Sequence, residues 1–226
     1  MGIHFKDIKY FEEITDWLKY KKYIGNLNGL RLCEIGDLWI RADLHNYMKH
    51  RLASQYFEAK GLDVSVIDLG VGTESIEASE KRMNGKILRY DLGKPIIEDI
   101  GNFDFIVDFG TAEHIENQYE LHRNMHNLCD VNSIMIRSNP SDKYSGGDSS
   151  KHHGLFHYTS AFYIKLSRIC NYEIIDIREM KQKYSSINVP GRKNFTYVTL
   201  VKSKNNIFPS LEIFNRIVGE LGRYEK

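Results

Sequence analysis

The order of apolar segments along the chain constrains the fold more than any other feature of the sequence. Five short apolar runs predict buried strands, at residues 30–35, 64–69, 86–90, 105–107 and 131–137. Two further strands, at 172–179 and 195–202, have no helix between them. Strands joined by helices need right-handed crossovers and form a parallel sheet, whereas two consecutive strands can form an antiparallel hairpin. The pattern therefore predicts an α/β fold with a parallel sheet and a reversed strand near one edge.

Helical spacing of apolar residues fills the intervals between these strands. The expected helices cover residues 7–23, 40–59, 74–83, 116–128, 159–170 and 207–221. A chain of 226 residues can bury a full core, so we expect one domain over residues 1–226. Within it, residues 1–27 form an N-terminal helical extension.

The charge balance and the absence of special segments argue against several classes of protein. Lys and Arg total 31 against 30 for Asp and Glu, without a polybasic stripe, so no nucleic-acid partner is expected. No run is long enough to span a membrane, and the N-terminus lacks the apolar core of a signal peptide. Cys33, Cys129 and Cys170 are widely spaced, as expected for buried free thiols. We therefore expect a cytoplasmic protein without a membrane partner.

The segment 103–115 is the most informative motif. Its apolar strand stops in polar residues, and open α/β sheets place their ligands at such carboxyl ends. From Asp108 to His114 it reads Asp-Phe-Gly-Thr-Ala-Glu-His. This resembles the fourth-strand motif of class I S-adenosylmethionine-dependent methyltransferases, in particular a subgroup with a motif near Asp-Gly-Gly-Thr-x-Glu-His. In that subgroup, several members are encoded beside bacterial sugar and capsule biosynthesis genes. The similarity covers about residues 30–180 and continues in the segment His153-Gly-Leu-Phe156.

The resemblance implies a fold, a cofactor and a reaction. The fold would be a Rossmann-like, seven-stranded, mostly parallel sheet in the order 3-2-1-4-5-7-6, with helices on both faces. The cofactor would be S-adenosyl-L-methionine. The reaction would be methylation of a small polar acceptor, most simply O-methylation of a sugar, nucleotide-sugar or related metabolite. The resemblance names neither the acceptor nor the methylated atom, and the oligomeric state stays open.

The resemblance also assigns cofactor-binding residues to the first strand. Glu34, Gly36 and Asp37 occupy the place of the family's first motif, where a glycine lets the backbone approach the cofactor. The second and third glycines of that motif are missing here. Judged alone, these residues also suit an ordinary strand-to-helix turn.

The next three strands supply the remaining cofactor residues. Asp68, followed by Leu69, ends the second strand and can accept hydrogen bonds from both ribose hydroxyls. The resemblance places the adenine beside Tyr90, Asp91 and Leu92, and the fourth-strand residues Asp108, Phe109 and Gly110 beside the cofactor. Asp68 and Asp91 are also compatible with simple turn or capping roles.

Three histidines are candidates for the proton acceptor that methyl transfer to a hydroxyl requires. An imidazole suits that task because it titrates near neutral pH. His153 and His157 belong to an expected acceptor-site loop at 138–157, and we rank them above His114, which lies on the cofactor side and suits a structural role, hydrogen-bonding the backbone to shape the loop, better than catalysis. The cluster Asp142, Asp148, His152 and His153 has no recognised metal-ligand spacing, so no metal is expected.

Two other functions are compatible with parts of this pattern. An NAD-dependent oxidoreductase is disfavoured because the chain lacks Gly-x-Gly-x-x-Gly and ends in a strand pair. A catalytically silent binding or scaffold protein with a methyltransferase fold is compatible with the missing glycines of the first motif.

Overall fold

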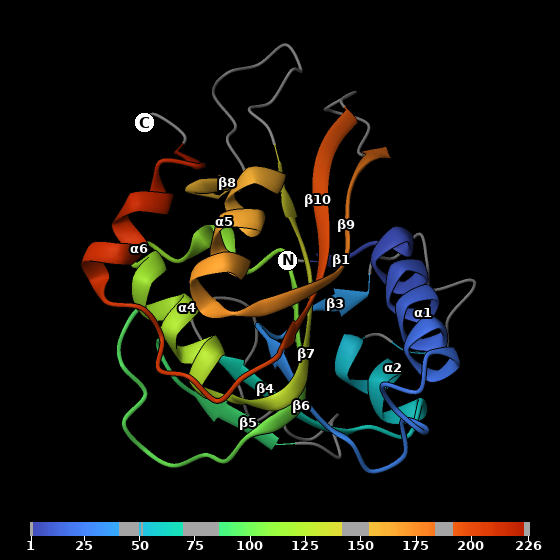
Figure 1. Cartoon of the computed structure of the whole chain (residues 1–226). Helices are drawn as coiled ribbons and strands as arrows, with labels where there is room; N and C mark the ends of the chain where they lie inside the picture. The colour runs from blue at the N-terminus through green and yellow to red at the C-terminus, as the bar shows by residue number, and fades with distance from the viewer. Residues whose placement is uncertain are drawn as a thin grey trace.

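A seven-stranded sheet forms the centre of the molecule (Figure 1). The computed structural model describes residues 2–40, 50, 52–69, 86–141, 154–183 and 192–223. The strands of the sheet are β2 (Arg31–Ile35), β4 (Asp63–Asp68), β5 (Lys86–Arg89), β6 (Phe103–Phe109), β7 (Cys129–Pro140), β9 (Tyr172–Lys183) and β10 (Arg192–Lys202). Their spatial order is β5-β4-β2-β6-β7-β10-β9, which is 3-2-1-4-5-7-6 when these strands are counted along the chain.

The directions of the strands follow the predicted pattern. The neighbouring pairs from β5 to β7 are parallel, and β10 runs antiparallel to both β7 and β9. The predicted α/β class, with a mostly parallel sheet and one reversed strand, is therefore confirmed.

Helices cover both faces of the sheet, and each face has its own apolar core. On one face lie α1 (Phe5–Tyr20) and α2 (Ala53–Ala59); on the other lie α4 (Gln118–Asn127), α5 (Ser160–Cys170) and α6 (Leu211–Val218) (Figure 1). Phe105 and Val107 of β6 point into the first core, and Ile106 points into the second. A strand buried on both faces needs a nearly continuous apolar run, which explains the composition of β6.

The N-terminus is attached to the loop that follows β2. β1 (Gly2–Ile3) pairs in parallel with β3 (Trp39–Ile40). The predicted helix at 40–59 is wrong at its start, because Ile40 belongs to this strand and α2 begins only at Ala53. Ile3 and Ile40 are both buried, so strand pairing hides two apolar side chains here. Residues 41–49, and the whole predicted helix at 74–83, lie outside the described residues.

A second small sheet is missing from the sequence prediction. β8 (Phe156–Tyr158) pairs antiparallel with β11 (Leu221–Arg223). The predicted loop at 138–157 is accordingly shorter at both ends, because β7 continues to Pro140 and β8 begins at Phe156. The predicted last helix is shorter too, ending at Val218 before β11. None of the helices in the described ranges is long and apolar enough to cross a membrane.

Candidate functional site

The loops that follow β2 and β6 touch each other at the carboxyl end of the sheet. Gly36 has φ +81°, and its N–H donates to the Ile67 carbonyl at 2.8 Å. A Cβ at this position would clash with Oγ1 of Thr111. Gly36 is therefore required twice, for its left-handed backbone and for the close approach of Thr111.

Two buried polar atoms flank this contact without a hydrogen-bond partner among the described residues: Oε2 of Glu34 and Oγ1 of Thr111. The Glu34 side chain is fully buried, and its Oε1 accepts from the Leu38 N–H at 3.2 Å. Burial raises the pKa of the Glu34 carboxyl well above its ordinary value, with the nearby Asp37 adding to the shift. Buried polar atoms of this kind usually have a partner, so their position indicates a site for a polar ligand group. Thr111 was not among the predicted site residues.

The predicted residues of the first and second strands come together. The backbone N–H of Asp37 donates to Oδ2 of Asp68 at 2.9 Å. Leu69 follows β4 with 55% of its surface exposed. An acidic side chain thus stands at the end of β4 beside the turn after β2, as a ribose-binding carboxylate would require.

The predicted adenine-binding residues lie after β5. Leu92 is buried and Tyr90 half-buried against the same core. Asp91 caps its own turn: Oδ1 accepts from the Gly93 N–H at 2.9 Å, and Oδ2 lies 3.3 Å from Nζ of Lys94. These contacts fit the turn role that the sequence also allowed for Asp91.

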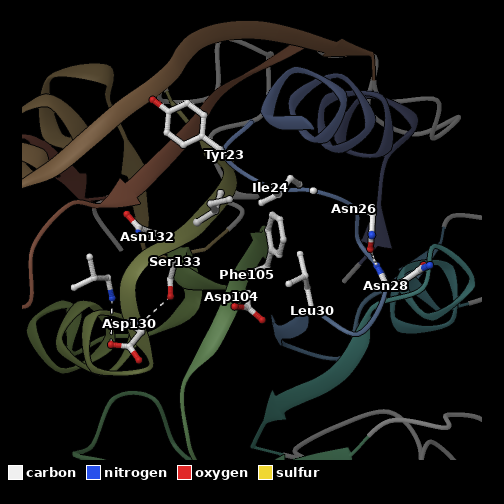
Figure 2. A pocket seen from close by; sticks show the side chains of 13 residues that line it. Tyr23, Ile24, Asn26, Asn28, Leu30, Asp104, Phe105, Asp130, Asn132 and Ser133 are labelled. Atoms are coloured by element: carbon white, nitrogen blue, oxygen red, sulfur yellow. Dashed lines mark hydrogen bonds between the residues drawn. The ribbon is translucent and has the colours of Figure 1, made fainter. Parts of the chain in front are cut away.

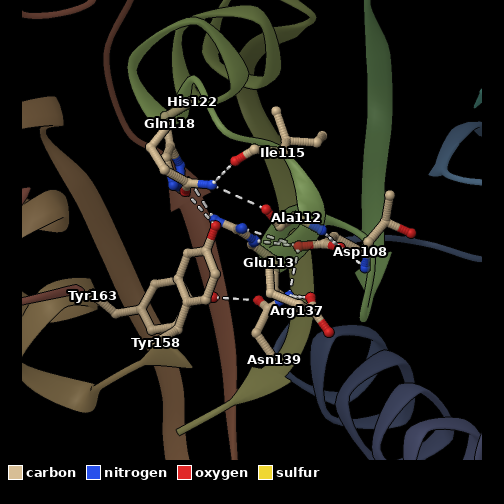
Figure 3. A network of polar contacts seen from close by, with 11 residues as sticks. Asp108, Ala112, Glu113, Ile115, Gln118, His122, Arg137, Asn139, Tyr158 and Tyr163 are labelled. Atoms are coloured by element: carbon tan, nitrogen blue, oxygen red, sulfur yellow. Dashed lines mark hydrogen bonds and ion pairs between the residues drawn. The ribbon is translucent and has the colours of Figure 1, made fainter. Parts of the chain in front are cut away.

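Asp108 is the centre of a buried polar network (Figure 3). Its Oδ2 accepts from Nε and Nη2 of Arg137, at 3.0 and 2.9 Å, and from Nδ2 of Asn139 at 3.1 Å. Its Oδ1 accepts from the N–H groups of Thr111 and Ala112, both at 3.1 Å. Both carboxylate oxygens of Asp108 are thus engaged within the protein, so this side chain shapes the loop after β6.

The guanidinium of Arg137 lies beside two aromatic rings that stack on each other. Its centre is 5.2 Å from the ring centroids of both Tyr158 and Tyr163. Nη1 contacts Nδ1 of His122 at 3.3 Å, and burial with this cation holds the pKa of His122 well below its ordinary value. The Tyr158 hydroxyl donates to Oε1 of Gln118. A buried cation is thus paired, stacked and enclosed at the carboxyl end of β7.

Phe109 and Gly110 continue from this network into the loop. Phe109 is buried, and Gly110 has φ +93°. A Cβ on Gly110 would lie 3.4 Å from Oε1 of Glu113.

Glu113 is the most informative residue that the predicted site omitted. Its side chain is fully buried, and Oε2 accepts from Nδ2 of Asn139 at 3.1 Å. The Tyr163 hydroxyl in turn donates to Oδ1 of Asn139 at 2.5 Å. Burial, reinforced by the Asp108 carboxylate, raises the pKa of Glu113 to about 8. Its presence in the 108–114 motif was the available signal.

The histidine candidates occupy different places. His114 ends the short turn η2 (Ala112–His114), with 36% of its side chain exposed and Nε2 3.9 Å from Oε1 of Glu113. His157 lies in β8 with its ring against Gly222 of β11. His153, and the cluster of Asp142, Asp148 and His152, lie outside the described residues. Within the described ranges, no group of three or more His, Cys, Asp or Glu could hold a metal ion.

A hollow of about 450 Å³ opens at the opposite end of the sheet (Figure 2). Its walls come from the loop between α1 and β2 and from the starts of β6 and β7. Its polar groups contact neighbouring backbone: Oδ2 of Asp104 accepts from the Arg31 N–H at 2.8 Å, and Oδ1 of Asn26 accepts from the Asn28 N–H at 2.8 Å.

Solved structures with the same architecture are methyltransferases in several cases. TehB from Haemophilus influenzae has a TM-score of 0.58 and 17% identity, over 84% of this chain and 62% of that chain. A SAM-dependent methyltransferase from Methanosarcina mazei has a TM-score of 0.58 and 10% identity, over 82% of this chain and 97% of that one. A third structure is the 1,6-didemethyltoxoflavin-N1-methyltransferase of Burkholderia thailandensis with bound 1,6-didemethyltoxoflavin and S-adenosylhomocysteine. It has a TM-score of 0.52 and 14% identity, over 78% of this chain and 72% of that chain.

These similarities concern the fold. No protein-family model matches the chain. No curated protein matches it by sequence. The chain therefore has the class I fold of SAM-dependent methyltransferases, while its own residues must support any assignment of chemistry.

Proposed function

We propose that this protein is an S-adenosylmethionine-dependent methyltransferase that acts on a small polar acceptor. A hydroxyl group of a sugar, nucleotide-sugar or related metabolite is the acceptor class that the motif resemblance favours. The observation that carries the proposal is the pair of unpartnered buried atoms, Oε2 of Glu34, two residues before Gly36, and Oγ1 of Thr111, which contacts Gly36, in a methyltransferase fold.

The residues at the carboxyl end fit this cofactor. Glu34 would face its ammonium group, since a buried carboxylate needs a cationic or donor partner. Asp68 would accept hydrogen bonds from the ribose, and Tyr90 and Leu92 would flank the adenine. When bound, the cofactor supplies a methyl group on a positively charged sulfur, which is already a good leaving group.

The chain's own contribution is alignment and the exclusion of water. The buried Asp108–Arg137 pair fixes the loop after β6, so that Gly110 and Thr111 keep their positions. The segment 138–157 would cover the acceptor, and one of His114, His153 and His157 would take its proton. We propose a cytoplasmic enzyme on the basis of the sequence composition.

Isothermal titration with S-adenosylmethionine and S-adenosylhomocysteine tests the proposal. Both should bind, and Asp68→Lys should weaken binding at least ~30-fold, because it replaces two ribose hydrogen bonds by a mismatch worth about 2 kcal/mol or more. Glu212→Lys makes the same charge change on the exposed face of α6 and should leave the dissociation constant unchanged. Equal affinities in all three proteins would remove Asp68 from the site.

A catalytically silent binding protein is the second candidate. It is favoured by the missing glycines of the first motif and by the packing of Thr111 over Gly36. The same titration separates the candidates: absence of binding of either compound to the folded wild-type protein would favour the silent protein.

A further inference from the structure

The structure places a fully buried acid, Glu113, next to a partly exposed imidazole, that of His114. Resting on the proposed function, we infer that His114 takes the proton of the acceptor hydroxyl and that Glu113 positions and charge-compensates its imidazole. His114 would be the catalytic residue and Glu113 the positioning residue. The sequence ranked His153 and His157 first, and Glu113 was not a candidate.

The geometry separates the two roles. Glu113 is fully buried, so it cannot reach an acceptor directly. His114 is its neighbour in the η2 turn, with 36% of the side chain exposed and Nε2 3.9 Å from Oε1 of Glu113. The imidazole can therefore face a ligand on one side and the buried carboxyl on the other.

Glu113 is held firmly enough to position a neighbour. Its Oε2 accepts from Asn139, and its backbone carbonyl accepts from the Leu155 N–H at 2.7 Å. Gly154, at φ +87°, packs so closely that a Cβ there would lie 2.7 Å from Cγ of Glu113. Gly110 leaves room on the side of Oε1. Oε1 is the carboxyl oxygen that lies 3.9 Å from Nε2 of His114, close enough for an electrostatic interaction with a protonated imidazole.

The titratable and charged groups around Glu113 lie on each of the elements packed against it. They are the carboxylate of Asp108 on β6, the guanidinium of Arg137 on β7, the phenols of Tyr158 on β8 and Tyr163 on α5, and the imidazole of His114 on η2. Asp108 and Arg137 form an ion pair with each other, which leaves the imidazole of His114 as the neighbouring group that Glu113 can compensate. A positive imidazole would draw the Glu113 proton away and be stabilised in return.

The proposed step balances in atoms and charge. The acceptor oxygen forms a bond to the methyl carbon while the sulfur–carbon bond breaks, and that electron pair goes to sulfur, which becomes a neutral thioether. The hydroxyl proton goes to His114. The imidazolium that forms is compensated by Glu113 and later releases its proton to solvent.

His157 is less suited to this step. It lies in β8 between Phe156 and Tyr158, which are both buried. Its ring rests on the paired strand β11, where a Cβ on Gly222 would lie 1.5 Å from Cε1 of the imidazole. The ring of His157 therefore covers the backbone of the small sheet, whereas His114 stands beside the buried acid.

The pairing can be tested without knowing the acceptor, through the pH dependence of His114 modification by diethyl pyrocarbonate, which attacks neutral imidazole. Peptide mass spectrometry would follow His114 between pH 5 and 9 in the wild type, Glu113→Gln and Glu116→Gln. Glu116 lies two residues after His114, is exposed and pairs with Arg223, so its substitution is a matched control. We expect the Glu113→Gln profile to shift to lower pH and Glu116→Gln to follow the wild type. An unchanged Glu113→Gln profile would overturn the inference.

Two further measurements keep the test decisive. In the wild type alone, coupling to Glu113 should give His114 a two-step profile, so a single-step profile contradicts the pairing even if Glu113→Gln does not fold. S-adenosylhomocysteine should slow His114 modification at least threefold. Binding of this compound without protection would refute the catalytic role, whereas absence of binding would instead refute the proposed function.

Discussion

The two ends of the central sheet use polar residues in opposite ways. At the amino end, Asp104 and Asn26 accept hydrogen bonds from nearby backbone at the rim of an open hollow (Figure 2). At the carboxyl end, Asp108, Glu113 and Arg137 are fully buried and joined through side chains from different elements (Figure 3). Burying such groups costs free energy unless they are paired. The carboxyl end therefore holds a buried network between elements, whereas the polar groups at the amino end contact nearby backbone.

The largest effect should follow from removing the buried cation. Arg137→Met leaves the Asp108 carboxylate buried without its ion pair and should lower the free energy of unfolding by ~3–5 kcal/mol. The exposed pair of Arg216 and Glu212 provides the control: Arg216→Met should change stability by less than ~0.5 kcal/mol. Urea denaturation of both variants measures the contrast. Similar losses of unfolding free energy in the two variants would mean that the buried ion pair stabilises the protein no more than the exposed pair does.

The second largest effect is a change of folding stability with pH that depends on Glu113. The pKa of Glu113 is raised from 4.5 to about 8 in the folded protein, so the folded state holds this proton more tightly than the unfolded chain. The resulting stability is complete below pH about 4.5 and is lost as pH rises toward 8. Glu113→Gln avoids this loss of stability, because the glutamine side chain does not lose a proton as pH rises. Its stability relative to the wild type should therefore rise between pH 5 and 8, by on the order of 3 kcal/mol, and then level off. A stability difference that stays constant with pH would contradict the assignment.

The attachment of α1 to the carboxyl end gives a third test. Oδ1 of Asp7 accepts from the hydroxyls of Ser138 and Tyr197, both at 2.8 Å, at a buried position. Asp7→Ala should cost ~2 kcal/mol, because two buried donors lose their acceptor. Asp16→Ala, on the exposed side of the same helix, should cost less than ~0.5 kcal/mol. Equal thermal shifts in a melting experiment would show that α1 is not fixed through Asp7.

The smallest expected effect comes from replacing one glycine by alanine at each end of the central sheet. Gly36→Ala introduces a Cβ at φ +81° against Thr111 and should cost ~1–2 kcal/mol and weaken S-adenosylhomocysteine binding. Gly25 lines the amino-end hollow, and a Cβ added there would meet nothing within 4 Å, so Gly25→Ala should be neutral in both measurements. Adding Thr111→Ala to Gly36→Ala should recover part of the stability. If both single variants bind equally well, the contact between the β2 and β6 loops is not part of the binding site.

Periodicity and strand composition predicted much of the fold. The apolar runs that became β2, β4, β6 and β7 are long enough, and bounded clearly enough, to be recognised without tertiary information. The errors fall where pairing partners are distant in sequence. Ile40 pairs with Ile3, and Phe156 with Arg223, so neither strand has a local signal. Such short strands form because a partner from elsewhere in the chain supplies their hydrogen bonds.

For the site, the sequence located the carboxyl ends of the strands but did not rank the residues there. Through the family resemblance it singled out Glu34, Gly36, Asp68 and Asp108, which lie in or just after the ends of predicted strands. The sequence could not show that Asp108 accepts hydrogen bonds from Arg137 and Asn139, or that Thr111 contacts Gly36. These contacts join residues from different strands and the loops that follow them.

The order and periodicity of local segments were enough to predict the α/β class, the reversed strand and the end of the sheet that carries the polar motifs. They could not predict which polar groups are buried, paired or left without a partner. Burial and pairing depend on side chains from separate elements, such as Glu113 and Asn139, meeting in one place once the chain has folded. That meeting buries Glu113 beside Asp108 and holds it next to His114, which is the geometry on which the proposed role of His114 rests.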